Sequence, residues 1–433
     1  MFLREVVESH NPWWSDPQSR PAAALRVKRD LHDPLLKRLR EPLERRAALL
    51  VGPRQVGKTT LLLQLAGTLL DDGLPPAQLL YIDFSDYRLA DRVVRDPEAM
   101  TAVVPRGSGT APRIFLLDEI TQATGWDRWL KAKVDLLRRN DVPASILATD
   151  SAARLLRRGG EDSGQGRWDE IRIETLGYPE FSRLLPPGRD PFELYMQLGG
   201  FPEFVMADDF GESHRRLRED IVDKAVRRDL AAEVRRIEVL RRLFVYLVQH
   251  SGAIANSRKL GGVLGVDHRT IGAWLDLLEQ TALVVRLPRH AGRESSRLRG
   301  KPKLYALDHA LVHAMSTLPA DASERRGRVA ETAVFRHLRE LTGGLGVSYH
   351  RPTEQAEIDF VVEGERQVAV QVTASLKPDG KKLKRLNRST LETAAKIFIT
   401  GGADEGRVDS VAVLPLRRFL QLETLDQLLE VGR

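Results

Sequence analysis

The chain has 433 residues, too many for one ordinary hydrophobic core, so about two to four domains are expected. It contains no cysteine, which excludes disulfides, thiolate zinc sites and cysteine nucleophiles. The net charge of +7 suits a nucleic-acid partner, but 60 acidic residues accompany 67 basic ones, so an ordinary mixed surface explains it equally well. We expect a cytoplasmic protein, because no apolar segment is long enough to cross a bilayer and no signal peptide is recognisable.

Five short apolar runs predict strands that are buried on both faces. They are residues 46–52, 79–86, 114–119, 144–150 and 169–176. Helix-like stretches separate most of these runs, and this alternation is typical of a parallel sheet covered by helices. We therefore predict an α/β core over residues 46–190, preceded by an N-terminal arm over residues 1–45.

The rest of the chain predicts two further domains. Between residues 236 and 307 the order is helix, short helix, turn, helix, strand and strand, which is the order of a winged helix-turn-helix. The C-terminal part combines a helix with several strand-like runs. We predict a helical and winged-helix domain over residues 191–310 and a second α/β domain over residues 311–433.

A glycine-rich loop follows the first predicted strand and matches the pattern GxxxxGK[ST]. Its glycines allow backbone amides to curl around a phosphate, and the following helix adds its positive N-terminal end. Lys58 is expected to neutralise phosphate oxygens and Thr59 to ligate Mg²⁺, so the cofactors expected are ATP and Mg²⁺. The residues expected to contact the nucleotide are Gly52, Pro53, Arg54, Gln55, Val56, Gly57, Lys58, Thr59 and Thr60.

Two carboxylates end the strand-like run IFLLDE, at the edge where an open parallel sheet places its ligand groups. Asp118 is expected to offset the magnesium charge through a water molecule. Glu119 is expected to polarise an attacking water, which favours hydrolysis over transfer to another substrate. The sequence therefore predicts a metal site at Thr59 and Asp118 with Glu119 as the catalytic base.

Two other catalytic candidates have ordinary alternatives. Asp150 ends the next predicted strand with Thr149 and Ser151, where these side chains could sense the γ-phosphate or orient the water. The alternative is a plain turn at a strand end. Arg167 precedes the fifth strand and is a candidate transition-state arginine, in cis or across a subunit boundary. The alternative for Arg167 is a surface salt bridge.

These motifs resemble the bacterial and archaeal AAA-like ATPases that join a P-loop core to a C-terminal nuclease-like domain of the PD-(D/E)XK type. The resemblance rests on GPRQVGKTT, on LLDEI, on LGGFPEF and on the winged-helix region, and it runs from about residue 20 to the C-terminus. It implies an ATPase core of the additional-strand type, with links to DNA transactions. AAA-like relatives form rings, so the resemblance also implies a homo-oligomer.

The resemblance is incomplete in the nuclease-like domain. An active nuclease of that fold holds Mg²⁺ with a helix glutamate, a strand-end aspartate and a following (D/E)-x-K, whose lysine stabilises the attacking water. Glu331 and Asp359 match the first two positions, but Gln371 and Thr373 replace the acid and the lysine. Both losses weaken catalysis, so we predict a degenerate nuclease core kept for binding or assembly. The alternative is that Lys377 supplies the missing cation.

Two regions are expected to bind DNA. In the winged helix, His268, Arg269 and Thr270 would lie at the tip of the second helix, with Ile271, Trp274, Leu275 and Leu278 facing the core. The cations between the two wing strands are Arg293, Arg297, Arg299 and Lys301. The segment Lys377–Arg388 is the densest basic run and is expected to bind backbone phosphates. The alternatives are that the winged helix acts as a packing or interaction module and that the four cations of the wing loop are simply solvated.

The favoured function is a Mg-dependent ATPase that couples ATP binding and hydrolysis to domain rearrangement and acts on DNA. One alternative is an ATP-driven signalling or protein-interaction switch without DNA. The other is an ATP-gated nuclease.

Overall fold

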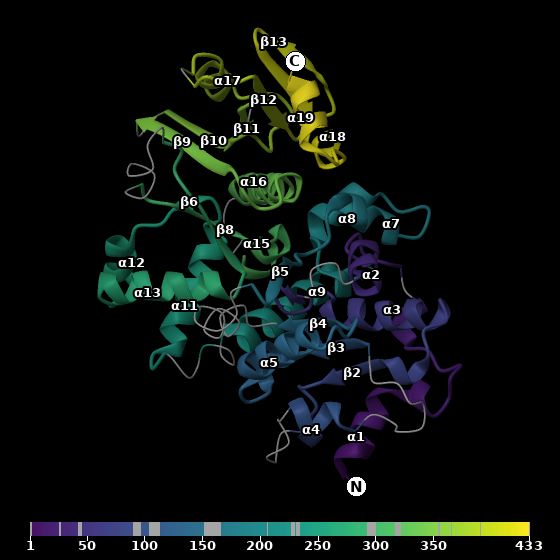
Figure 1. Cartoon of the computed structure of the whole chain (residues 1–433). Coiled ribbons are helices and arrows are strands. Elements are labelled where there is room, and N and C mark those ends of the chain that lie inside the picture. Colours follow the sequence, from purple (N-terminus) through teal and green to yellow (C-terminus); the bar gives the residue numbers. More distant parts are fainter. Residues whose placement is uncertain are drawn as a thin grey trace. The chain divides into compact units, whose positions relative to one another are not determined.

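The structure, a computed structural model, describes residues 2–25, 27–41, 46–89, 97–103, 113–150, 166–205, 207–226, 230, 234–291, 300–316, 322–353, 356–364, 366–389 and 391–432. The chain divides into two compact units, residues 1–174 and residues 175–433 (Figure 1). Each unit is described by itself.

The first unit alternates helices and strands as the apolar pattern predicted. Its main helices are α1 (Phe2–His10), α2 (His32–Arg40), α3 (Lys58–Asp71), α4 (Pro97–Thr101) and α5 (Trp126–Arg139). Its short 3₁₀ helices are η1 (Pro12–Trp14), η2 (Ala22–Leu25), η3 (Pro76–Gln78), η4 (Tyr87–Leu89) and η5 (Ile120–Gln122). Its strands are β1 (Ala47–Val51), β2 (Leu79–Asp83), β3 (Ile114–Asp118), β4 (Ser145–Asp150) and β5 (Trp168–Arg172).

The five strands form one parallel sheet in the order β2-β3-β4-β1-β5. The prediction of a parallel α/β core is confirmed. β4 lies between β1 and β3. In this register Val51 pairs with Asp150 and Asp83 pairs with Asp118, so the carboxyl ends of several strands lie at one edge.

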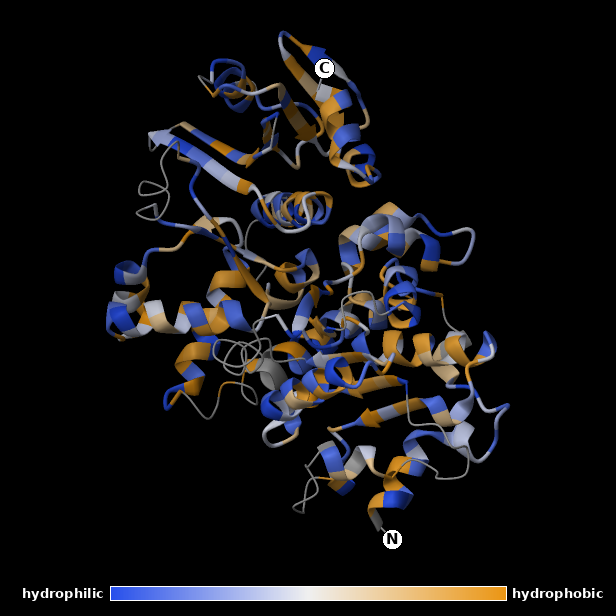
Figure 2. Ribbon diagram, in the orientation of Figure 1, coloured by the Kyte–Doolittle hydropathy of each residue, from blue (hydrophilic) through white to orange (hydrophobic). Residues whose placement is uncertain are grey.

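Helices cover both faces of this sheet because alternate strand residues point to opposite sides. On one face Leu49, Leu117 and their neighbours pack against α1 and α5. On the other face Leu50, Leu116 and their neighbours pack against α2 and α3. Figure 2 shows the strands as mainly hydrophobic.

The N-terminal arm is part of this packed unit. The side chain of Trp13 is 1% exposed and lies in the core that α2 and α3 cover. The indole nitrogen of Trp14 donates a hydrogen bond to the carbonyl oxygen of Leu79 at 3.0 Å. Both tryptophans therefore anchor the arm to the start of β2.

The second unit is mixed. Its main helices are α7 (Tyr178–Leu184), α8 (Pro191–Leu198), α9 (Phe210–Leu217), α11 (Ile237–Gln249), α12 (Ser257–Leu264), α13 (His268–Gln280), α15 (His309–Met315), α16 (Ala322–Leu341), α17 (Gly380–Asn387), α18 (Leu416–Leu420) and α19 (Leu425–Gly432), with the 3₁₀ helix η6 (Pro202–Phe204) and the π-helix η7 (Arg218–Val226). Its strands are β6 (Ala253–Ile254), β7 (Val284–Leu287), β8 (Lys303–Ala306), β9 (Val347–Thr353), β10 (Ala356–Val362), β11 (Val368–Val372), β12 (Ala395–Thr400), β13 (Gly406–Val408) and β14 (Val411–Pro415).

Two sheets of the second unit share one apolar core. A three-stranded sheet has the order β6-β8-β7, and a six-stranded sheet has the order β13-β14-β12-β11-β10-β9. Tyr305 of β8, Phe335 of α16 and Phe360 of β10 lie in this common core. Leu176 and Phe181 belong to it as well, which explains why the unit begins before the boundary suggested at residue 190.

Between α11 and β8 the structure has the helices and the two final strands read from the sequence, and it adds the short strand β6 between α11 and α12. α13 begins at His268, because Asp267 caps it by accepting a hydrogen bond from the Arg269 amide at 2.8 Å. The side chains expected to face the core are buried, namely Ile271, Trp274, Leu275 and Leu278.

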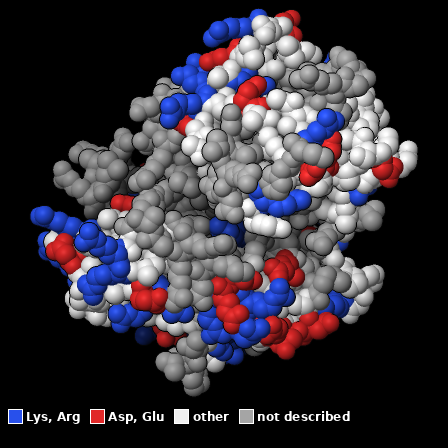
Figure 3. Space-filling model, turned by 90° about the horizontal axis from the view of Figure 1, so that it is seen from below, with Lys and Arg blue, Asp and Glu red and all other residues white. Residues whose placement is uncertain are grey.

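The surface carries charges of both signs. On the face in Figure 3, Lys and Arg side chains lie among Asp and Glu side chains. Within the described ranges, every helix is too short or too polar to traverse a lipid bilayer.

Candidate functional site

The glycine-rich loop connects β1 to α3 and is sharply curled. Gln55 and Gly57 have left-handed backbones, with φ of 62° and 91°. Gly52 lies against the chain that leaves β5: a β-carbon there would be 2.1 Å from the carbonyl oxygen of Ile173. No side chain fits at this distance, so the first glycine is required by this close approach. Val56 is fully buried and fixes the middle of the loop to the core under α3.

Lys58 begins α3 and holds the loop together. Its ammonium donates hydrogen bonds to the carbonyl oxygens of Gly52, at 2.8 Å, and Pro53, at 2.6 Å. Burial lowers the pKa of Lys58 to about 8. Nearby carboxylates at the strand ends oppose this shift. The ammonium is therefore bound by neutral carbonyl groups that a more strongly charged ligand can replace.

Asp118 is the centre of a hydrogen-bond network at the carboxyl edge of the sheet. The hydroxyl of Thr59 donates to it at 2.6 Å, and Thr149 also donates to it. The phenol of Tyr81 donates at 3.4 Å. Burial raises the pKa of Asp118, while the bonds from Thr149 and Thr59 act in the opposite direction. The structure thus brings together Thr59 and Asp118, the two residues expected to hold the metal.

Glu119 follows Asp118 in a strained backbone conformation. Its φ and ψ are 51° and 45°, a left-handed conformation that costs energy for a residue with a side chain. The Glu119 amide donates a hydrogen bond to the Thr149 hydroxyl at 3.1 Å, which ties the turn to β4. The Glu119 side chain is half-buried. Strain of this kind is typical of functional sites.

Asp150 joins the same edge. It ends β4 beside Val51 of β1 and is fully buried, and it accepts a hydrogen bond from the Thr121 hydroxyl at 2.9 Å. Its charge acts on Lys58. Asp150 therefore lies with the phosphate loop, as its proposed role requires, whereas Ser151 lies outside the described residues.

Arg167 does not join this group within its own chain. It precedes β5, whose first residues pair with the first residues of β1, so it lies at the amino end of the sheet. Its guanidinium contacts the carboxylate of Asp135 at 3.3 Å. The expectation that Arg167 acts in cis is wrong for this geometry, because the phosphate loop follows the opposite end of β1.

Two residues near the loop had no sequence signal. Tyr81 reads only as part of an apolar strand, although its phenol reaches Asp118. Arg29 belongs to the N-terminal arm and donates to the carbonyl oxygens of Val56, at 2.9 Å, and Glu174, at 3.2 Å. In a chain rich in arginine, nothing in the sequence distinguishes Arg29 from the others.

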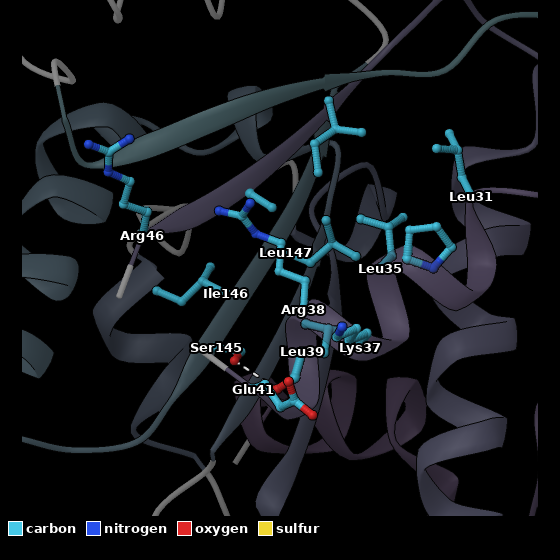
Figure 4. A pocket seen from close by; sticks show the side chains of 13 residues that line it. Leu31, Leu35, Lys37, Arg38, Leu39, Glu41, Arg46, Ser145, Ile146 and Leu147 are labelled. Atoms are coloured by element: carbon cyan, nitrogen blue, oxygen red, sulfur yellow. Dashed lines mark hydrogen bonds between the residues drawn. The ribbon is translucent and has the colours of Figure 1, made fainter. Parts of the chain in front are cut away.

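A cavity of about 370 Å³ lies elsewhere in the first unit, between α2 and the sheet (Figure 4). Leu35 and Leu39 of α2 line it together with Ile146 and Leu147 of β4, and the Ser145 hydroxyl donates a hydrogen bond to the Leu39 carbonyl at 2.8 Å. Residues of the phosphate loop are not among those that line it.

The second predicted site lies in the second unit. Gln371 donates a hydrogen bond to Asp359, and the charge of Glu331 acts on Asp359. Lys377 is exposed, and the cations that act on Asp359 are Lys303 and Lys382. The sequence had named neither of these two lysines for that position.

Three segments of the chain match sequence families. Residues 44–182 match a family described as an AAA domain. Residues 189–322 and 326–419 match two domains of unknown function, DUF8612 and DUF4143. The AAA segment contains the phosphate loop, Asp118, Glu119 and Asp150.

Similar proteins and structures were also found. An uncharacterized protein of Haemophilus influenzae is 27% identical over 384 residues, which is 84% of this chain and 91% of that protein. An uncharacterized protein of Mycobacterium tuberculosis is 26% identical over 425 residues, which is 96% of this chain and 89% of that protein.

Among solved structures, the Thermotoga maritima RuvB Holliday junction branch migration motor has 15% identity and a TM-score of 0.31, over 64% of this chain and 96% of that one. The Aeropyrum pernix ORC1 protein in complex with DNA has 15% identity and a TM-score of 0.33, over 69% of this chain and 95% of that one. The assignment of an AAA-type P-loop domain rests on the sequence match and the geometry of the loop, and that expectation is confirmed. The winged-helix and nuclease-like interpretations remain predictions.

Replacing Gly52 by alanine tests the close approach of the loop to Ile173. The added carbon would meet a backbone oxygen, so the loop has to move and ATP affinity should fall at least about tenfold. Titration calorimetry with a non-hydrolysable ATP analogue measures this. Gly272→Ala is the control, because its β-carbon meets no heavy atom within 4 Å and alanine favours the helix. Unchanged affinity in Gly52→Ala would contradict the assignment.

Replacing Arg29 by alanine tests whether the arm supports the loop. Loss of the charged donor to the Val56 carbonyl should weaken ATP binding about tenfold, and Arg29→Lys should retain part of the affinity. Lys28→Ala is the matched control, because the Lys28 ammonium donates its hydrogen bond to the Thr68 hydroxyl and not to the phosphate loop. Equal affinities for the Arg29→Ala and Lys28→Ala proteins would show that Arg29 has no such role.

Proposed function

We propose that this protein is a Mg-dependent ATPase in which ATP binding and hydrolysis change the relation between its two units, and that it acts on DNA. The observation that carries the proposal is the meeting of Lys58 and Thr59 with Asp118 and Glu119 at one edge of the sheet. This combination provides a cation for phosphates, oxygen ligands for a metal and a carboxylate for water.

The residues present fit a magnesium ion. Thr59 and Asp118 offer a hydroxyl and a carboxylate that already share a hydrogen bond, and oxygen donors of this kind suit a hard cation. Bound there with ATP, Mg²⁺ would neutralise phosphate charge. Thr59 is exposed at the end of the loop, so its hydroxyl can reach a ligand from solvent.

Each remaining residue has a defined role in the proposal. Lys58 exchanges its two loop carbonyl partners for phosphate oxygens, a gain that charged acceptors make favourable. Glu119 polarises the attacking water and is held by its bond to Thr149. Asp150 responds to the γ-phosphate from the end of β4. Because Arg167 lies at the amino end of its own sheet, its role is limited to the site of a neighbouring subunit in a homo-oligomer.

The path out of the first unit supports coupling to the second. Arg29 joins the loop, at Val56, to Glu174, the last residue of the first unit. The next residue, Thr175, begins the second unit, where Arg336 of α16 donates to both its carbonyl and its hydroxyl, the latter at 3.2 Å. A nucleotide that moves the loop therefore acts on the backbone that leads to α16.

The proposed DNA contacts rest on exposed cations of the second unit. Lys381 and Lys384 of α17 and Arg388, which follows its last residue in a helical conformation, are exposed at helical spacing, so they lie on one face. His268 and Arg269 are exposed at the start of α13. Of the wing cations, Lys301 is exposed, and Arg293, Arg297 and Arg299 lie outside the described residues. These cations would bind phosphates without reading sequence.

Two substitutions test the ATPase. Lys58→Ala should abolish ATP binding, because the loop loses its cation. Glu119→Gln should keep ATP affinity within about threefold and lower turnover by at least about a hundredfold, because the amide cannot polarise water. Calorimetry gives binding and phosphate release gives turnover. Normal turnover in Glu119→Gln would show that another group is the base.

Charge reversal on α17 tests the DNA proposal. Changing Lys381, Lys384 and Arg388 together to glutamate should lower duplex DNA affinity at least tenfold and flatten its salt dependence, because fewer counterions are released. Fluorescence anisotropy at several salt concentrations measures both. As a control, Arg407 and Arg418, which are exposed elsewhere in the second unit, are changed to glutamate. If the substitutions leave DNA affinity unchanged and DNA does not change ATP turnover, the protein-interaction switch is favoured.

A further inference from the structure

A charged cluster lies inside the second unit where β8, α16 and β10 meet. Lys303 comes from β8, Glu331 from α16, and Glu357 and Asp359 from β10. The side chain of Lys303 is only 3% exposed, and Asp359 is 4% exposed. Charges this deeply buried need partners, because the low dielectric penalises an isolated ion.

Lys303 supplies the most deeply buried positive charge of this cluster, while Arg351 lies 3.6 Å from Glu357 and Lys382 acts on Asp359. Its ammonium lies 2.7 Å from a carboxylate oxygen of Glu357 and 3.5 Å from one of Glu331. Burial alone would lower the pKa of Lys303. The nearby carboxylates instead raise its pKa above the ordinary value, so the amine stays protonated.

The other members of the cluster also have protein partners. The Tyr305 hydroxyl donates to Glu331 at 2.6 Å. Asp359 accepts hydrogen bonds from the Gln371 side chain and from the Val372 amide, the latter at 2.9 Å. Burial raises the pKa of Asp359 to about 6, which means that its charge is already costly. One oxygen of Asp359, Oδ2, and one oxygen of Glu331, Oε1, are thus already bound by groups of the protein.

We infer that Lys303 is the resident cation of this cluster and occupies the place of the Mg²⁺ ion that the nuclease resemblance implies. The nuclease metal does not fit these residues. An ammonium at 2.7 Å from Glu357 excludes a second cation by charge repulsion and by volume. Across the described part of the chain, no three His, Asp or Glu side chains are arranged to hold a metal ion.

This arrangement has a structural consequence. Lys303 lies in the segment that matches one family, residues 189–322, and its carboxylate partners lie in the segment that matches another, residues 326–419. The ion pairs therefore join β8 to α16 and β10 within the second unit. The cluster holds these three elements together inside a domain that we predict to serve binding or assembly. The inference does not depend on the ATPase, because all its groups lie in the second unit.

The direct test measures Mn²⁺ binding to the full-length, nucleotide-free protein by electron paramagnetic resonance. We expect no site with a dissociation constant below about 1 mM that is lost on Asp359→Asn. A site that disappears in Asp359→Asn but persists in Thr59→Ala would overturn the inference. A site lost only in Thr59→Ala belongs to the phosphate loop and leaves the inference standing.

A second measurement tests the lysine itself. Lys303→Met keeps most of the side-chain volume and removes the charge, so the melting temperature should fall by about 10 °C. Lys301→Met is the matched control, because Lys301 is exposed two residues away and should change little. The double variant Lys303→Met with Glu357→Gln should recover part of the loss. A Lys303→Met protein as stable as the control would overturn the inference. If that variant does not fold, the Mn²⁺ experiment on the unchanged protein still decides.

Discussion

Parallel pairing of β4 with both β1 and β3 is the constraint on which the candidate site depends. Parallel strands end at the same edge, so Val51, Asp118 and Asp150 lie close although they are far apart in the sequence. The strand between β1 and β3 also places Thr149 where its hydroxyl bonds both to Asp118 and to the Glu119 amide. The inserted strand thereby ties the two consecutive carboxylate residues together, while Thr59 connects Asp118 directly to the start of α3.

The two buried lysines illustrate how surroundings decide what an ammonium does. Lys58 is held by two carbonyl oxygens, and burial lowers its pKa to about 8. Lys303 is held by carboxylates that raise its pKa. Carbonyl dipoles bind a cation less strongly than carboxylates, so phosphate oxygens can displace them from Lys58. Lys303 would gain nothing from leaving its partners. One lysine is therefore prepared for a ligand, and the other already has its counter-ions.

Local patterns predicted the parts of the structure that depend on neighbouring residues. The five strands of the first unit, the curled loop and the carboxylates Asp118 and Glu119 followed from apolar runs and strand ends. The contacts of Arg29 and Lys303 were not predictable in this way, because each depends on partners distant in sequence and neither residue has a distinctive motif. Arg167 failed as a candidate in cis for the same reason: its place next to a strand was read correctly, but which end of the sheet it occupies follows from the pairing of β5 with β1.

Gln371, at the position where the nuclease resemblance expects an acid, is best understood together with Lys303. A carboxylate at position 371 would add a further negative charge beside Asp359, which burial already makes difficult to ionise. The amide instead donates a hydrogen bond to Asp359, and Lys303 balances the remaining carboxylates without a metal. The interior of the domain is thereby satisfied by the chain itself, while the cations of α17 remain exposed to solvent. In the proposed arrangement, these exposed cations are available to a phosphate backbone, and Lys303 occupies the place of the ion that cleavage would need.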